Sequence, residues 1–421
     1  MSKRRYKSEE FKNVDWDRVQ GRIEGERVVL AVDVAKEDFV ATLLDYEQAA
    51  LLTFKWCHPQ ETAEVLERML RLGQGRRLEA VLEPSGTYGD ALLWQLRQAG
   101  IAVYRVSPKR VHDAAEVYDG VPSLHDAKAA YLIGRLHLQG VSQPWQESSE
   151  ERRELKAVQT RLRVCKEREQ AARARLEAHL SRHWPEIPGI LPLGSATLSA
   201  LIGTYGDPAS VASDACAAQA LMRRAGGPGL SEEKIQTVLA SARSSLGVPA
   251  VAAERELLQW LGAEALEAGQ QVRQVEREIE RRVEHDPQLR PLAAVIGKVS
   301  AAVLLAAVGS PRDYPDAASY LKALGLNLKE RSSGKHKGQV KLTKRGPSLA
   351  RFYLYFAALR LIARDPIVKR WYQLKSNRPG ALKNKCVIAL MRKLAKALWH
   401  LARGSAFDAN KLFDRKAVAG V

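Results

Sequence analysis

Hydrophobic and polar positions follow two different periods along this chain, and the change falls near residue 148. Before it, short apolar runs such as RVVLAVD, FVATLLD and IAVYRV end at Gly, Pro or Asp, which predicts buried strands. The segment RLEAVLEPSGTYGDALLWQLRQAG (77–100) predicts a strand, a loop and an amphipathic helix. Alternating strands and helices predict a layered α/β domain over residues 25–148, after a basic tail at 1–24.

From Ser149 the apolar positions recur every three or four residues among dense Arg and Glu. Two segments share this spacing: Leu155, Val158, Leu162 and Cys165, and later Val272, Val275, Ile279 and Val283. A narrow apolar seam is typical of coiled-coil helices. We expect a helical arm over residues 149–290, whose two long helices pair as an antiparallel hairpin or across a dimer.

An internal repeat connects this arm to the region after it. LGSATLSALIGTYGDP (193–208) and IGKVSAAVLLAAVGSP (296–311) align without gaps at an offset of 103. Both resemble the second half of a helix-hairpin-helix, in which a glycine opens a helix whose amides hold a backbone phosphate. Two similar core hairpins explain the pattern equally well. The second copy is apolar enough to suggest a membrane span, but Gly297-Lys298 interrupts it, which favours a buried hairpin.

Positive charge is concentrated at the C-terminus. The net charge is +18, yet residues 321–421 carry 24 Lys and Arg against 4 Asp and Glu, whereas the rest carries 42 against 44. A basic block interleaved with aromatic residues attracts polyphosphate by counterion release, and nucleic acid is the expected partner. A solvated basic surface or an anionic-membrane patch are the alternatives.

The cysteines and the N-terminal residues bear on whether the protein is secreted or cytoplasmic. Four widely spaced cysteines without a CxxC pair predict reduced, buried thiols, neither a disulfide framework nor a zinc site. MSKRRYKSEE has no apolar region typical of a signal peptide. These features predict a cytoplasmic, nucleoid-associated bacterial protein without a membrane partner.

Three acids stand at positions where α/β folds place chemistry. Asp33 ends the first apolar run, Glu83 ends the run AVLE, and Asp126 opens an apolar helix. Each alone has a structural explanation, because strand-end acids are often solvated and Asp favours helix starts. Clustered carboxylates repel one another, however, and Mg²⁺ compensates that repulsion. Two ions about 4 Å apart can support phosphodiester cleavage. The acids of an RNase H-like nuclease follow the same chain order: an Asp at the end of a strand that leads into a second strand, a Glu at the end of a later strand, and an Asp on a helix.

At these residues the sequence resembles the bridge-RNA-guided insertion-sequence transposases of the IS-one-ten (IS110) family. The resemblance rests on LAVDVAKEDF, AVLEPSGTYGDALLWQL and VSPKRVHDAAEVYDGVPSLHDAKAAYLIGRL, and on AAVIGKVSAAVLLAAVGSPRDYPDAASYLKALGL and RSSGKHKGQVKLTKRGPSLARFYLYFAALR near the C-terminus. It implies a RuvC-like DEDD domain at residues 25–148. It also implies a mostly helical C-terminal transposase domain at 291–402, followed by a tail at 403–421.

One position departs from the family pattern. The third acid of the DEDD set should stand three residues before Asp126, where this chain has Ser123. Asp119 or Asp113 could supply the missing ligand, or Ser123 could bind metal through its hydroxyl or a water. Three acids can still hold two Mg²⁺ ions if phosphate and water complete the coordination.

A serine in the basic region completes the implied site. From its residues alone, ERSSGKHKGQVKLTKRG is a flexible phosphate-binding turn. The family carries a catalytic serine directly before a glycine here, which implies Ser333 as the nucleophile, with Ser332 as the alternative. The nearby cations would stabilise the transition state or bind backbone phosphates. The cations expected to stabilise the transition state are Arg331, Lys335 and Lys337. Those expected to bind backbone phosphates are Lys344, Arg345 and Arg351.

The leading hypothesis is therefore a DNA recombinase that exchanges donor and target strands through a phosphoserine. A guide RNA follows from the resemblance alone, and strand exchange between two duplexes predicts a dimer or tetramer. A RuvC-like nuclease that cuts branched DNA with water is the second hypothesis. A non-catalytic nucleic-acid-binding protein, whose acids are structural, is the third.

Overall fold

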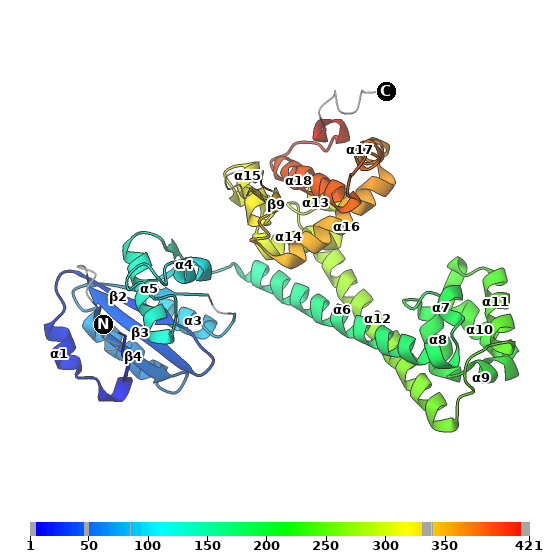
Figure 1. Cartoon of the computed structure of the whole chain (residues 1–421), viewed down its shortest axis with the longest axis horizontal. Helices are drawn as coiled ribbons and strands as arrows, with labels where there is room; N and C mark the ends of the chain where they lie inside the picture. The colour runs from blue at the N-terminus through cyan, green and yellow to red at the C-terminus, as the bar shows by residue number, and fades with distance from the viewer. Residues whose placement is uncertain (1–5, 46–49, 85, 331–337, 339, 414–421) are drawn as a thin grey trace. The chain divides into compact units, whose positions relative to one another are not determined.

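The protein is described by a computed structural model that covers residues 6–45, 50–84, 86–330, 338 and 340–413. Its contacts divide the chain into two compact units, Met1–Glu147 and Ser148–Val421. The first unit is a mixed α/β layer and the second is almost entirely helical (Figure 1). Each unit has hydrophobic cores of its own.

A seven-stranded mixed sheet organises the first unit in the order β1-β4-β3-β2-β5-β6-β7. Its central strands form an antiparallel meander, and two further strands then run parallel to β2. The strands are β1 (Glu9–Glu10), β2 (Arg27–Asp33), β3 (Asp38–Asp45), β4 (Ala50–Cys57), β5 (Arg77–Leu82), β6 (Ala102–Arg105) and β7 (Gln143–Pro144). This arrangement fits an RNase H-like domain, and the strands predicted from the apolar runs are confirmed.

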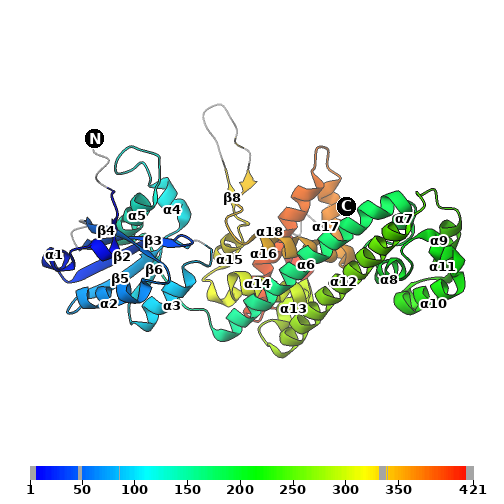
Figure 2. The ribbon, with the colours of Figure 1, turned by 90° about the horizontal axis from the view of Figure 1, so that it is seen from below.

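Strand alternation gives the sheet two apolar faces, each covered by helices. On β2, Val28, Leu30 and Val32 face one core, whereas Val29 and Ala31 face the other. The first core contains α1 (Trp16–Gly21), α2 (Thr62–Leu72) and α3 (Asp90–Gln98); the second contains α4 (Pro108–Asp113) and α5 (Asp126–Leu138). Figure 2 shows α2 and α3 on one side of the sheet and α4 and α5 on the other.

Helix α5 lies unusually close to the sheet because it has a glycine at the point of contact. A Cβ added at Gly134 would collide with Leu44 and lie 3.0 Å from the Cβ of Ala31. The helix is buried on more than one face, since Lys128, Leu132 and His137 are buried together with Ala127, Ala130 and Ile133. The close packing fixes α5 against β2 and β3.

Two long helices, α6 (Glu150–His183) and α12 (Ala252–His285), form an antiparallel pair in the second unit. The predicted apolar seam is buried between them and against neighbouring helices, which confirms the two long helices. Ion pairs join their charged flanks, including Lys166–Glu276 at 2.8 Å and Arg175–Glu264 at 2.7 Å. The two helices therefore pair within one chain, as the first of the two alternatives predicted. The coiled-coil packing itself stays a prediction.

The helix pair carries a small helical lobe toward each end. The distal lobe consists of α7 (Ile187–Ile190), α8 (Ala196–Tyr205), α9 (Pro208–Ser213), α10 (Ala215–Gly226) and α11 (Glu232–Arg243). The C-terminal lobe consists of α13 (Arg290–Ile296), α14 (Lys298–Val308), α15 (Ala317–Ala323), α16 (Ser348–Arg364), α17 (Pro366–Ser376) and α18 (Lys383–Ala402), with the two-stranded ribbon β8 (Leu328–Lys329) and β9 (Lys341–Leu342). Both lobes bury side chains of α6 and α12 in their cores.

The internal repeat corresponds to α8 and α14. Both helices end at a glycine with positive φ, Gly206 at 77° and Gly309 at 86°. Their starts differ, because Ser195 caps α8 with its side chain, whereas Gly297 itself caps α14. The break at Gly297 confirms the predicted helical hairpin, and the helix-hairpin-helix interpretation stays a prediction.

The structure corrects two expectations about which residues are buried. The four thiols are free, but Cys216 is exposed and only Cys386 is buried. The segments expected as tails also join the cores, through Phe11 and Trp16 at one end and Phe413 at the other. Large apolar side chains in both segments account for this packing. No helix in the described part of the chain is long and apolar enough to cross a membrane.

Candidate functional site

The structure brings the three predicted acids to one edge of the sheet in the first unit. Asp33 is the last residue of β2 and pairs with Val40 of β3. Glu83 directly follows β5, whose Leu82 pairs with Val32. Since neighbouring strands keep their side chains in register, Asp33 and Glu83 emerge next to each other at the carboxyl ends of β2 and β5.

Asp126 reaches the same edge from α5. Val40, opposite Asp33, packs against Ala127 and Ala130 in the first turns of this helix. Asp126 is the first helical residue, and the N-cap is His125, so the Asp126 side chain makes no capping hydrogen bond. It is exposed. The capping explanation for this acid therefore does not hold, although its negative charge favours a helix start.

The three carboxylates sense one another electrostatically. Burial, together with the charges of Asp126 and then Glu83, raises the pKa of Asp33 to about 6. Burial also raises the pKa of Glu83. Each shift means that the charged form is disfavoured where it stands. The edge is therefore an anionic cluster that a cation would stabilise.

This donor set suits a hard divalent cation. Carboxylate oxygens are the protein ligands that Mg²⁺ prefers, and it needs only one or two of them because water and phosphate complete its octahedron. Within the described residues no group of three or more His, Cys, Asp or Glu side chains is already close enough to hold one ion. The residues present thus fit magnesium shared with a substrate phosphate better than a closed protein cage.

The residues considered for the missing fourth ligand are occupied or exposed. Asp119 accepts a hydrogen bond from Lys128 Nζ at 2.9 Å, and Lys128 is almost fully buried. Asp113 binds Lys109 through both carboxylate oxygens, at 2.7 and 2.5 Å. Ser123 is exposed and lies in the loop three residues before Asp126. Both upstream acids are therefore neutralised by lysines, and Ser123 is the candidate without a competing ion pair.

A second ionisable cluster, not predicted from the sequence, lies at the opposite end of α5. Glu79 of β5 is fully buried and accepts a hydrogen bond from Arg27 Nε at 2.6 Å. Its Oε2 is 3.1 Å from His137 Nε2, and His137 Nδ1 is 2.6 Å from Ser142 Oγ. Although burial acts to raise it, hydrogen bonds from His137 and Arg27 hold the pKa of Glu79 below its ordinary value. The cluster fixes the C-terminal end of α5 to β5.

Glu79→Ala is expected to destabilise the protein by about 3 kcal/mol, because it leaves the half-buried charge of Arg27 and the buried imidazole of His137 without their partner. Calorimetric unfolding of the full chain, read on the transition of the first unit, measures the loss. Glu67→Ala is the matched control, because Glu67 forms an exposed pair with Arg71 and should change that transition little. An equal shift for both variants would contradict the anchoring role.

The predicted serine region is only partly within the described residues. Ser332, Ser333, Arg331, Lys335 and Lys337 lie outside them. The flanking strands β8 and β9 pair antiparallel, with Leu328 opposite Leu342. The structure therefore places the two ends of this segment side by side in the C-terminal lobe.

The three remaining cations predicted to bind backbone phosphates differ in their surroundings. Lys344 and Arg345 are exposed beside the ribbon. Arg351 is half-buried and donates to the carbonyl oxygen of Gly346 at 2.6 Å, and burial lowers its pKa. Arg351 therefore holds the start of α16 in place. Tyr355, one turn further along α16, donates to Asn384 Oδ1 at 3.1 Å.

Comparisons with known proteins match both units. A DEDD transposase model of the IS110 group, described as "Transposase", matches residues 30–185, which include all three acids. A model described as "Transposase IS116/IS110/IS902 family" matches residues 294–373, which include Ser333. A "Probable family 20 transposase" of Pseudomonas aeruginosa is 30% identical over 174 residues, 40% of this chain. The match covers 49% of that relative, so the chain spans about half the length of the curated relative it matches.

Proposed function

Because this chain belongs to the IS110-type transposase family, we propose that it cleaves and exchanges DNA strands at an insertion sequence. The proposal rests on the acidic edge of the first unit, which is formed by Asp33, Glu83 and Asp126. Three carboxylates from two strands and a helix lie close enough to interact electrostatically, and burial together with this repulsion raises the pKa of Asp33 to about 6. Such an arrangement is costly without a cation, which is typical of a site built to bind one.

Asp33, Glu83 and Asp126 would hold two Mg²⁺ ions, with Ser123 or a water in place of the missing acid. When bound, the ions would neutralise the scissile phosphate and lower the pKa of an attacking hydroxyl. The protein's own contribution is to fix the three carboxylates. Asp33 and Glu83 are fixed by strand register, and Asp126 is fixed by the close packing of α5.

The nucleophile in this proposal is Ser333, with Ser332 as the alternative. Its Oγ forms a bond to phosphorus while one P–O bond of the DNA backbone breaks, and the hydroxyl proton passes to a base. The freed DNA hydroxyl leaves with the other fragment. Attack of a DNA hydroxyl on the phosphoserine then forms a new P–O bond and releases the serine, so no ATP is needed. Arg331, Lys335 and Lys337 would offset the phosphate charge.

The partners follow from the same proposal. Donor and target DNA are the substrates, and Lys344 and Arg345 are exposed where backbone phosphates could be bound. A structured bridge RNA would select the sites, and a dimer or tetramer would supply an active site for each strand. A water-using RuvC-like nuclease remains the second candidate, because the acidic edge by itself could serve hydrolysis.

The decisive experiment incubates the purified full chain with donor DNA, target DNA and the RNA encoded beside the element. The proposal expects protein–DNA adducts that survive denaturation, form with Mg²⁺ but not with EDTA, and map to Ser333 or Ser332 by mass spectrometry. Cleaved DNA without any adduct would instead support the water-using nuclease. Binding without cleavage, unchanged by Asp33→Ala, would support the non-catalytic alternative.

A further inference from the structure

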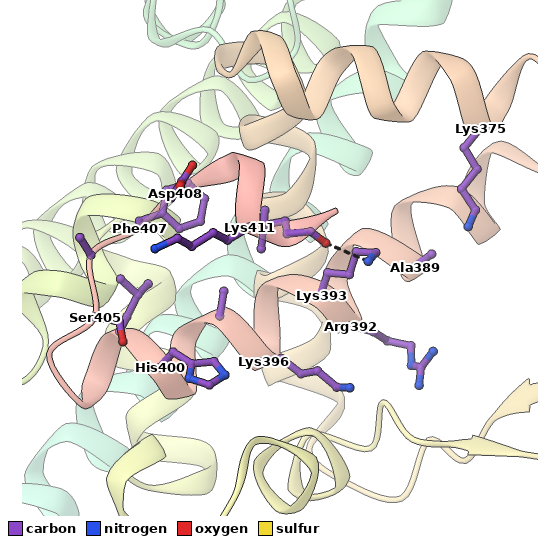
Figure 3. A pocket seen from close by; sticks show the side chains of 14 residues that line it. Lys375, Ala389, Arg392, Lys393, Lys396, His400, Ser405, Phe407, Asp408 and Lys411 are labelled. Atoms are coloured by element: carbon purple, nitrogen blue, oxygen red, sulfur yellow. Dashed lines mark hydrogen bonds between the residues drawn. The ribbon is translucent and has the colours of Figure 1, made fainter. Parts of the chain in front are cut away.

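The C-terminal lobe contains a cavity of about 820 Å³ that the proposed chemistry does not use. Its walls are helix α18 and the segment 405–412, which folds back beside it, with Lys375 contributed by α17 (Figure 3). Six of the fourteen lining side chains are basic: Lys375, Arg392, Lys393, Lys396, His400 and Lys411. The carboxylate in the lining is Asp408, and it caps the following 3₁₀ turn by accepting from the backbone amide of Asn410 at 2.9 Å.

The position of the cations follows from the helix and from the folded-back segment. Arg392, Lys396 and His400 are four residues apart and therefore share one face of α18. Lys393 Nζ donates to the carbonyl oxygen of Leu412 at 2.8 Å, which fastens the segment to the helix. Lys411 comes from that segment and lines the cavity as well, with its side chain directed toward Phe407 and Asp408 (Figure 3). The cavity therefore has positive charge on two walls.

Within the described residues, acidic side chains do not neutralise the positive charge of the cavity. No ion pair within the described residues joins Lys375, Arg392, Lys396 or Lys411 to an acid. Arg392 makes its hydrogen bond to a neutral group, the carbonyl oxygen of Leu326, at 2.9 Å. Like charges gathered around a concave surface focus the field and favour a bound polyanion.

The cavity also has an apolar side. Ala397 and Leu401 of α18 and Phe407 of the folded-back segment line it together with the cations. Phe407 is half-buried, so part of the ring is accessible. A bare phosphate would need no apolar wall, whereas a nucleotide has both an anionic phosphate and a base that packs on an apolar or aromatic surface. The volume falls within the roughly 300–1,000 Å³ that holds a small ligand.

We propose that this cavity binds an unpaired nucleotide of a single-stranded nucleic-acid segment. Lys396 and Lys411 hold the flanking phosphates, and the base packs against Phe407 and Leu401. A paired base cannot enter, because its faces are occupied by stacking within the duplex. The inference rests on the proposed function only for the class of ligand, nucleic acid, and it does not depend on strand cleavage. RNA and DNA share this chemistry, and the experiment distinguishes them.

The test measures binding of the full chain to fluorescent single-stranded oligonucleotides in EDTA, so that loss of cleavage cannot affect the result. We expect Lys396→Ala/Lys411→Ala to lower the magnitude of the salt dependence, d log K/d log[salt], by about 1.4, because two phosphate contacts are lost. Phe407→Ala is expected to weaken binding by roughly 5- to 150-fold. Duplexes of equal length should respond much less to either change. Parallel RNA and DNA arms identify which strand is preferred.

The matched control is Lys322→Ala/Lys369→Ala, which removes two exposed lysines of the same lobe that do not line the cavity. Equal losses for the cavity variant and this control would overturn the proposal, as would equal effects on duplex and single strand. Displacement of the oligonucleotide by an acidic peptide but not by a free nucleotide would also overturn it, in favour of a protein partner. Unchanged thermal unfolding of each variant confirms that folding is intact. A photoreactive base that crosslinks to Phe407 keeps the test decisive if a variant fails to fold.

Discussion

Asp33→Asn is expected to abolish magnesium-dependent strand cleavage, with a loss of at least about 100-fold. Removing a group that only supports a metal ligand already costs roughly 10- to 100-fold, and Asp33 would be a ligand itself. Binding to donor and target DNA should be retained, because the change removes negative charge and leaves the basic C-terminal lobe intact. Cleavage and binding measured on the same substrates separate the two effects.

The same substitution should stabilise the protein when metal is absent. The folded-state pKa of Asp33 is raised to about 6, so the folded protein holds a proton that the unfolded chain has already lost near its ordinary value of 3.8. Stability is therefore lost as pH rises from about 4 to 6 and stays lost above it. A neutral amide removes this cost, by about 1–2 kcal/mol after allowance for solvent screening.

Thermal unfolding at pH 7.5, with and without Mg²⁺, measures this effect. Wild-type protein should be stabilised by Mg²⁺, whereas Asp33→Asn should begin more stable and respond less to the ion. Asp17→Asn is the matched control, since Asp17 is exposed on α1 away from the acidic edge. If Asp33→Asn kept cleavage within about threefold of wild type, the assignment of the acidic edge would be refuted.

Ser333→Ala is expected to eliminate the covalent protein–DNA adduct completely, since a methyl group cannot form a bond to phosphorus. Metal binding should be unaffected, because the acids of the first unit are unchanged. The measurement is a denaturing gel with labelled donor DNA, followed by mapping of any modified peptide. Strand exchange should fail together with adduct formation.

Ser332→Ala is the internal control for that experiment, because it removes a neighbouring hydroxyl from the same basic segment. If Ser332→Ala lost the adduct while Ser333→Ala kept it, the nucleophile would be reassigned by one residue. Continued Mg²⁺-dependent cutting by Ser333→Ala, without adduct, would show that water is the nucleophile. These outcomes distinguish a recombinase from the water-using RuvC-like nuclease.

Local patterns were sufficient to predict the elements that place the acids. The apolar runs ending at Asp33 and at Glu83 could be read as strands, and the apolar helix after Asp126 as a helix, because each depends on neighbouring residues. Convergence of the three then followed from the rule that active residues lie at carboxyl ends of parallel strands. The chain order of these acids was enough to propose an RNase H-like sheet.

Contacts between distant residues could not be predicted in this way. Glu79 and His137 are 58 residues apart and meet because α5 packs on β5. Asp119 was one of the alternatives for the missing metal ligand, but Lys128, which is buried on the same helix as Asp126, forms an ion pair with Asp119. A lysine within an apolar helix gives no local indication of its partner, because the partner depends on the tertiary fold.

The basic cavity shows the same limit at the C-terminus. The concentration of Lys and Arg was visible in the composition, whereas their arrangement was not. The segment after α18 was expected to be a tail, yet it folds back and buries Leu412 and Phe413 in the lobe core. A charge count therefore predicted the class of ligand but not the concave surface that would hold it.

The paired helices α6 and α12 fix the separation of the two helical lobes. On α6, Leu155–Leu162 belongs to the core of one lobe and Ala172–Leu180 to that of the other. Their midpoints are about 26 Å apart at the rise of an α-helix, which is less than one turn of a DNA duplex. The length of this helix pair therefore sets how far apart the two lobes stand. Inserting one heptad into each helix would lengthen that spacing by about 10 Å.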